Sequence, residues 1–212
     1  MDLVILFTVF GFLFLAELGD KTQLIIFNLV IDLEEKPYKI GIGASLGFAT
    51  IITLGIIFGT FITKIIPIGI ITILSGIVFI LIGILEIRNL KGLYLEMKPS
   101  HKNEEESLLN EESNEVSYIE KFTRNPYLIG FFSIFIMELG DKSQILTISL
   151  ASIYILPLEV WLGSFFALAL LTWIGVLFGA IILKYLPKFY IKIIAIIVFI
   201  SVGIFILLSN LI

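Results

Sequence analysis

The seven residues Glu-Leu-Gly-Asp-Lys-Thr-Gln at 17–23 recur as Glu-Leu-Gly-Asp-Lys-Ser-Gln at 138–144. Both copies lie inside long apolar runs, where lipid is the expected surrounding. An ionisable side chain at that depth costs about 3 kcal/mol or more. A chain that places Glu, Asp and Lys there twice is therefore expected to use them.

The composition around these copies is that of a membrane protein. Of the 212 residues, 58% are hydrophobic and 15% are charged, and the mean hydropathy is +1.09. Soluble domains are about 45–50% apolar and about 25% charged. The absence of cysteine excludes disulfides and thiolate chemistry. A lipid bilayer is thus the expected partner, and the net charge of −4 gives no indication of a nucleic-acid partner.

Six apolar segments predict six transmembrane helices, at 3–31, 40–63, 67–87, 126–153, 158–183 and 189–209. The one sizeable polar stretch is acidic and separates the third span from the fourth. We interpret it as a solvated linker. An alternative stays open, in which it is an antenna that concentrates or senses cations and includes the sole histidine, His101. The predicted organisation is a first repeat at 1–88, a linker at 89–125 and a second repeat at 126–212.

The two halves are repeats of each other. The motif copies are 121 residues apart, and further on the spacing becomes 120, since Ile77–Ile80 matches Ile197–Ile200. Each repeat has three spans, an odd number, so the second must enter the membrane from the opposite side. Transporters built in this way bind their substrate near the midplane, between the repeats. The predicted fold is an all-α integral membrane protein with six transmembrane helices in two inverted three-helix repeats.

The distribution of Lys and Arg predicts the orientation. One face of the predicted bundle carries nearly all of them, and the other carries only Lys64. The basic face is expected to be cytoplasmic. Both termini are then outside and the acidic linker is in the cytosol. The glycine-rich second and fifth spans could pack within one chain or between two, so a homo-oligomer stays open.

The motif suggests a defined arrangement of charges. On a helix, Glu17 and Asp20 project to one side with Lys21 next to them, and the second copy repeats this geometry. Gly19 and Gly140 weaken the helix and let a neighbouring backbone or an ion approach. A break at these glycines would also free backbone carbonyls to line a cavity.

The two copies offer a metal ion only oxygen donors, from carboxylates, hydroxyls and amides: Glu17, Asp20, Thr22, Gln23, Glu138, Asp141, Ser143 and Gln144. Oxygen ligands suit Ca²⁺, Mn²⁺ and Mg²⁺, whereas zinc and copper favour His or Cys, which no span contains. Mg²⁺ gives up its water reluctantly, so Ca²⁺ and Mn²⁺ are the leading candidates. The ion would be cargo, and no cofactor is expected.

Counting charges suggests a mechanism. Four motif carboxylates and the two lysines, Lys21 and Lys142, sum to −2. A low-dielectric site needs two protons or one divalent cation to offset that charge. Burial and mutual repulsion favour protonated carboxyl groups, and metal binding expels protons. If the site carries either the divalent cation or the protons, alternating access exchanges one for the other. The lysines would then be swinging counter-ions. The proton would be coupled by the four motif carboxylates, Glu17, Asp20, Glu138 and Asp141.

Three other interpretations compete with this one. A passive divalent-cation channel would use similar ligands and differ only in coupling. The motif copies could instead form salt bridges that merely hold helices together. An intramembrane aspartyl protease is disfavoured, because the Lys after each Asp would hold it ionised, whereas a shared-proton pair needs one protonated carboxyl. The chain is therefore not expected to be an enzyme.

The paired E-x-G-D-K-[S/T] motifs, one in the first span of each half around an acidic linker, resemble the Gdt-type family of cation/proton antiporters. That family has Golgi, plastid and bacterial members that move Mn²⁺ and Ca²⁺. The resemblance covers nearly the whole chain and implies export of cytosolic Mn²⁺ or Ca²⁺ in exchange for protons. Because the sequence lacks the N-terminal extension of organellar members, a cell-membrane location is expected. The resemblance assigns these residues to the cation site: Glu17, Asp20, Lys21, Thr22, Glu138, Asp141, Lys142 and Ser143.

Overall fold

The computed structural model describes residues 1–18, 20, 22, 26, 29–30, 37–96, 123, 125–185 and 188–209. These residues form helices and no strand, which confirms the expected all-α fold. The helices are α1 (Leu3–Glu17), α3 (Pro37–Ile65), α4 (Ile68–Glu96), α6 (Pro126–Met137), α7 (Lys142–Tyr154), α8 (Pro157–Tyr185) and α9 (Lys188–Ser209).

The first and fourth predicted spans differ from the structure at the motif. We expected unbroken spans at 3–31 and 126–153, but α1 ends at Glu17 and the fourth span is divided into α6 and α7. Among the described residues, three helices are long and apolar enough to cross a membrane: α3, the Ile68–Ile87 part of α4 and the Pro157–Leu177 part of α8. The helices α1 and α6 are apolar but shorter, because each stops where the motif begins.

The helix bounds differ less elsewhere. The helix α4 continues to Glu96, beyond the predicted end of the third span at 87, and α8 covers two more residues than expected at its C-terminal end. The helix α9 begins and ends close to the predicted sixth span.

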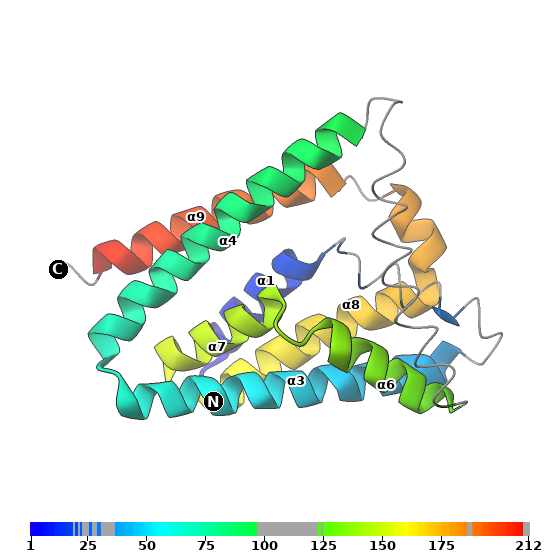
Figure 1. The fold of residues 1–212 in the computed structure, drawn as a ribbon, viewed down its shortest axis with the longest axis horizontal. Coiled ribbons are helices and arrows are strands. Elements are labelled where there is room, and N and C mark those ends of the chain that lie inside the picture. Colours follow the sequence, from blue (N-terminus) through cyan, green and yellow to red (C-terminus); the bar gives the residue numbers. More distant parts are fainter. Residues whose placement is uncertain are drawn as a thin grey trace.

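Equivalent helices of the two halves run in opposite directions, as expected for inverted repeats (Figure 1). In that view α4 runs from left to right, whereas α9 runs from right to left and ends at the C-terminus. The helices α3 and α8 are opposed in the same way. The packing is also symmetric, since α1 contacts α8, while their repeat equivalents, α6 and α3, contact each other.

Two equivalent glycines allow these symmetric helix pairs to approach closely. A Cβ atom added at Gly43 of α3 would lie 3.1 Å from the backbone nitrogen of Phe131 in α6. A Cβ atom added at Gly163 of α8 would lie 3.1 Å from the backbone nitrogen of Phe10 in α1. Close backbone approach through small residues is how membrane helices associate. The duplication seen in the sequence is therefore reproduced in the helix packing.

The contact between α4 and α9 lies on the pseudo-two-fold axis. Phe79 and Phe199 occupy equivalent positions, and their ring centroids are 6.2 Å apart. A Cβ atom at Gly83 would lie 2.7 Å from Cγ1 of Ile200, and one at Gly203 would lie 2.6 Å from Cγ1 of Ile80. These contacts of one repeat thus have their counterparts in the other.

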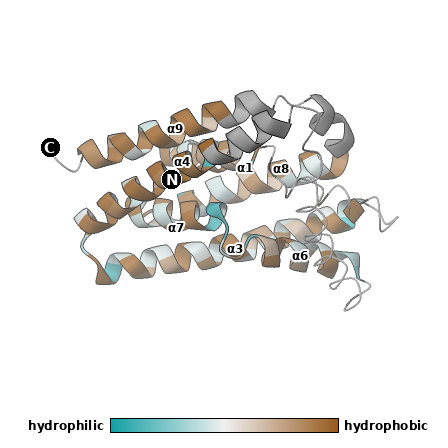
Figure 2. Cartoon of the chain, turned by 45° about the horizontal axis from the view of Figure 1, so that its top comes forward, coloured by the Kyte–Doolittle hydropathy of each residue, from teal (hydrophilic) through white to brown (hydrophobic). Residues whose placement is uncertain are grey.

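The helices are hydrophobic over most of their length (Figure 2). Large apolar side chains there are well exposed, among them Phe7, Phe61 and Phe205. A soluble monomer rarely exposes apolar area on this scale. Several carboxylates, in contrast, are buried inside the bundle, namely Glu17, Glu86, Glu138 and Glu159. The described helices are therefore apolar outside and bury several carboxylates within, as those of a multi-pass membrane protein do.

Candidate cation site

The first motif copy interrupts the helix that carries it. The backbone N–H of Leu18 still donates to the carbonyl of Phe14, at 2.9 Å, and Leu18 then turns to an extended conformation. The N–H of Asp20 donates to the carbonyl of Glu17 at 3.1 Å, and Asp20 lies outside the helix. The side chain of Glu17 is buried at this end of α1.

The second copy makes the same break between α6 and α7. The N–H of Asp141 donates to the carbonyl of Glu138 at 3.2 Å, which matches the bond between Asp20 and Glu17. Gly140 has a φ of +87°, a conformation that residues other than glycine adopt with strain. Its N–H donates to Oε1 of Gln144 at 2.6 Å. Gln144 therefore stabilises the break itself.

The expected helical geometry of the motif is wrong in both copies. We placed Glu17 and Asp20 on one face of a continuous helix, whereas Asp20 and Asp141 both follow a break. Gly140 was expected to let a neighbour approach, but a Cβ atom there would meet nothing within 4 Å. Its role is conformational, because the turn needs a positive φ. Broken helices are tolerated at membrane depth where they line a cavity.

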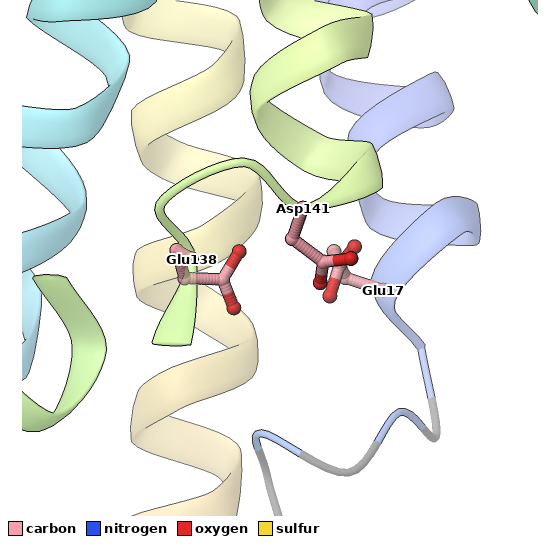
Figure 3. A group of neighbouring side chains, drawn as sticks. All are labelled: Glu17, Glu138 and Asp141. Atoms are coloured by element: carbon pink, nitrogen blue, oxygen red, sulfur yellow. The ribbon is translucent and has the colours of Figure 1, made fainter. Parts of the chain in front are cut away.

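The two breaks bring three carboxylates together. Oxygens of Glu17, Glu138 and Asp141 all lie within 4.8 Å of one another (Figure 3). Glu138 and Asp141 flank the second break, and Glu17 reaches them from the end of α1 (Figure 3). Ca²⁺ holds oxygens at 2.3–2.6 Å, so opposite ligands of one ion are about 5 Å apart. The spacing of this cluster is therefore suited to a single hard cation.

Two hydroxyl groups hold Glu138 in this cluster. Oγ1 of Thr22 donates to Oε1 of Glu138 at 2.9 Å, and Oγ of Ser143 donates to Oε2. Thr22 belongs to the first repeat and Ser143 to the second, so the bond from Thr22 joins the two halves. All three side chains are buried. A hydroxyl that donates to a carboxylate keeps its oxygen lone pairs, which can still face a cation.

Lys142 is the cation that the structure places beside these acids. Its ammonium forms an ion pair with Oδ2 of Asp20 and lies 3.9 Å from Oε1 of Glu17. It also lies 3.2 Å from Oε1 of Glu86 on α4. The lysine of the second repeat thus pairs with carboxylates of the first. An ammonium group and a metal ion would compete for Glu17 and Asp20.

Two small cavities adjoin the site, each of about 10 Å³. One lies beside Glu17 and is lined also by Thr22, Phe48 and Thr172. The other lies beside Lys142 and is lined also by Asp20 and Glu86. A volume of this order holds about one water molecule. Space for about one water molecule therefore lies beside Glu17 and beside Lys142.

The structure thus brings together most of the residues that the sequence proposed for the site. Glu17, Glu138 and Asp141 form the cluster, and Thr22 and Ser143 bond to it. Asp20 and Lys142 form an adjoining ion pair, and Gln144 bonds to backbone. The predicted roles of Lys21 and Gln23 lie outside the described residues, as does the role considered for His101.

Glu86 is the site residue that sequence reasoning missed. It lies within the predicted third span, and its side chain is buried against Lys142. The signal was present, since an ionisable residue inside a membrane span marks a functional position. Glu86 belongs to no repeated pattern, since the equivalent position in the second half is Ile206.

A family model for divalent cation/proton antiporters, GDT1, matches the chain in two segments, 5–92 and 126–211. The chain belongs to this family. The two matched segments cover most of the helices of each half, including both helix breaks, and the match omits residues 93–125. No curated protein and no solved structure matches the chain. Membership of the GDT1 family identifies the protein as a membrane transporter that exchanges divalent cations and protons.

Proposed function

We propose that this antiporter exports Mn²⁺ or Ca²⁺ from the cytosol in exchange for protons, by alternating access at the cluster of Glu17, Glu138 and Asp141. The observation that carries the proposal is that buried carboxylates of both repeats meet at one point. A site made from both halves is exposed in turn to each side when the halves rock against each other.

The donor set supports a hard cation as cargo. The cluster and the groups bonded to it offer carboxylate and hydroxyl oxygens. The chain has no Cys, and its one His lies in the acidic stretch, outside the described residues. Such oxygen sites favour Ca²⁺ or Mn²⁺ over the softer metals.

The lengths of the broken helices support a position near the membrane midplane. The helices α6 and α7 have 12 and 13 residues, or about 18 and 20 Å at 1.5 Å per residue. The hydrocarbon core of a bilayer is about 30 Å thick. A break between two segments of similar length therefore falls near its centre.

Charge balance supports proton exchange. Three carboxylates within 4.8 Å cannot all stay ionised in a buried site without a cation among them. Either a divalent ion or protons can fill that role, and each excludes the other. We propose that these two loads alternate, with Asp20 and Lys142 adjusting the remaining charge.

We further propose a location in the cell membrane, with both termini outside. One face of the predicted bundle carries nearly all the loop Lys and Arg residues, and the other carries only Lys64. This asymmetry supports the orientation, because basic loops stay on the cytoplasmic side. The acidic linker is then cytosolic. Labelling of single cysteines introduced near Asp2 and in the linker, in intact cells, checks the orientation: only the cysteine near Asp2 should react with an impermeant reagent.

The decisive experiment is uptake of Mn²⁺ and of Ca²⁺ into proteoliposomes with and without an imposed pH gradient. The wild type should take up the ion only when the gradient is present. The double variant E17Q/E138Q should take up none, because two cluster ligands are lost while side-chain volume is kept.

A matched control is available in E159Q. Glu159 is also buried, but it pairs with the amino terminus, 3.9 Å away, outside the cluster. This variant should transport as the wild type does. Uptake that ignores the pH gradient would instead indicate a passive channel. Loss of uptake in E159Q as well would mean that removal of any buried carboxylate disables the protein.

A further inference from the structure

Glu86 gives the site a feature that the repeat does not explain. Its Oε1 lies 3.2 Å from the ammonium of Lys142, and both side chains line the same small cavity with Asp20. Glu86 comes from α4, whereas the motif carboxylates come from the two breaks. It lies outside the group of Glu17, Glu138 and Asp141, whose oxygens share one centre.

The two repeats differ at this position. Glu86 is equivalent to Ile206, at the spacing of 120 that relates Gly83 to Gly203. A carboxylate on α4 is therefore available to the lysine of the second repeat, while α9 offers an isoleucine at the matching place. An exact repeat would have the same kind of side chain, either a carboxylate or an apolar group, at positions 86 and 206.

Cation binding would leave the Lys142 ammonium in need of a partner such as Glu86. The ammonium forms an ion pair with Asp20 and lies 3.9 Å from Glu17, which is part of the proposed cation cluster. A divalent ion bound to Glu17 would repel an ammonium at this distance, since charges in a protein interior are poorly screened. The ammonium must then withdraw from Glu17, and a buried ammonium without a partner is costly.

We propose that Glu86 is a positioning residue that holds the Lys142 ammonium when a divalent cation enters the cluster. This inference rests on the proposed function. Lys142 already contacts Glu86, so the ammonium needs only to give up Asp20 and Glu17 and keep its third partner. Lys142 and the cargo then share the site without competing for the same carboxylate.

The test is Mn²⁺ binding to the detergent-solubilised full chain, followed by electron paramagnetic resonance, in a double-mutant cycle of E86Q and K142M. In the wild-type background, E86Q should weaken Mn²⁺ binding about tenfold, within the usual range of coupling between sites, because Lys142 is left on Asp20 and Glu17. In the K142M background, E86Q should change nothing, because no ammonium remains to be held.

The conservative variant E86D keeps the charge and should restore most of the affinity. E159Q, which also removes a buried carboxylate from an ion pair, should bind as the wild type does. If E86Q does not fold, E86D is compared in both backgrounds, and its smaller loss of affinity should again occur only when Lys142 is present.

Each other outcome overturns the inference in a recognisable way. Equal losses in both backgrounds would make Glu86 a direct ligand of the cation. Unchanged affinity with lowered thermal stability would make it a structural partner of α7. Both results leave the proposed antiport intact. A wild type that binds no Mn²⁺ and no Ca²⁺ would overturn the proposed function together with this inference.

Discussion

The contact between α4 and α9 and the two helix breaks follow the same internal repeat to different extents. At the contact, Phe79 faces its own equivalent, Phe199. Gly83 packs against Ile200, and its equivalent, Gly203, packs against Ile80, the equivalent of Ile200. At the breaks the backbone is repeated as well, but Lys142 contacts Glu86, for which the second half has Ile206. The packing of α4 on α9 follows the duplication closely, whereas the charges near the breaks depart from it at Glu86.

The largest expected effect separates the two aspartates of the motif. Asp141 belongs to the carboxylate cluster, whereas Asp20 pairs with Lys142. We expect D141N to weaken Mn²⁺ binding about 100-fold, or about 3 kcal/mol, because the half-buried Asp141 supplies one of the three charged groups of the cluster. Asp141 makes no side-chain capping bond to α7, so the loss would not arise from the helix.

We expect D20N to weaken Mn²⁺ binding less than D141N, because a freed Lys142 retains Glu86. Binding isotherms of the two variants, measured side by side in detergent, check this order. A loss in D20N equal to that in D141N would mean that the two copies contribute alike to the cation site.

The second effect tests the symmetric packing. A methyl group at Gly43 would lie against the backbone carbonyl of Tyr127, and one at Gly163 would lie 2.6 Å from the carbonyl of Leu6. G43A and G163A should each lower the free energy of unfolding by about 2–3 kcal/mol, because backbone atoms cannot move aside easily.

Thermal unfolding in detergent measures these losses. The control is G11A, since a Cβ atom at Gly11 meets nothing within 4 Å. We expect G11A to be neutral or slightly stabilising, because alanine favours a helix over glycine. Loss of stability in only one of the two interface variants would show that the helix pairs are not equivalent.

A third, smaller effect concerns the hydroxyls on Glu138. T22V and S143A each remove one hydrogen bond to a buried carboxylate. A bond to a charged group contributes about 1.5 kcal/mol, or about tenfold in cation affinity. T22S should restore binding. Among the described residues, Thr8 bonds within its own helix, to the carbonyl of Val4, so T8V should leave Mn²⁺ binding unchanged.

The smallest expected effect lies in the turn itself. G140A should destabilise the fold by about 1 kcal/mol, because alanine is strained at a positive φ. G140N should cost less, since asparagine tolerates this conformation better. Chemical unfolding of both variants tests the order. Equal stability of G140A and the wild type would mean that the turn can relax to a negative φ at no cost.

The sequence predicted the architecture well because the duplication and the lengths of the apolar segments can both be read directly from the order of residues. The spacing of 120 that relates Ile77–Ile80 to Ile197–Ile200 already indicated that α4 and α9 are equivalent. The odd number of spans then required the repeats to be inverted. Both features follow from the order of residues along the chain, with no knowledge of contacts.

The site could be predicted only in part. The residue types indicated a carboxylate cluster, but helix periodicity placed Asp20 beside Glu17 on one face, and the break at Leu18 overrode that periodicity. The roles of Gln144 and Gly140 depend on the shape of the second break. Glu86 lies 56 residues from Lys142 along the chain, so only the folded structure reveals that they meet.

The bond from Thr22 to Glu138 has a consequence for how tightly cargo and motion are linked. It joins the first repeat to the second through Glu138, a carboxylate of the proposed cation cluster. If the halves move apart at this point, the bond breaks and Glu138 leaves Glu17, while Ser143 and Asp141, which belong to the same repeat as Glu138, stay beside it. In the proposed alternating access, the movement of the halves would therefore separate the ligands of the cation at the same time.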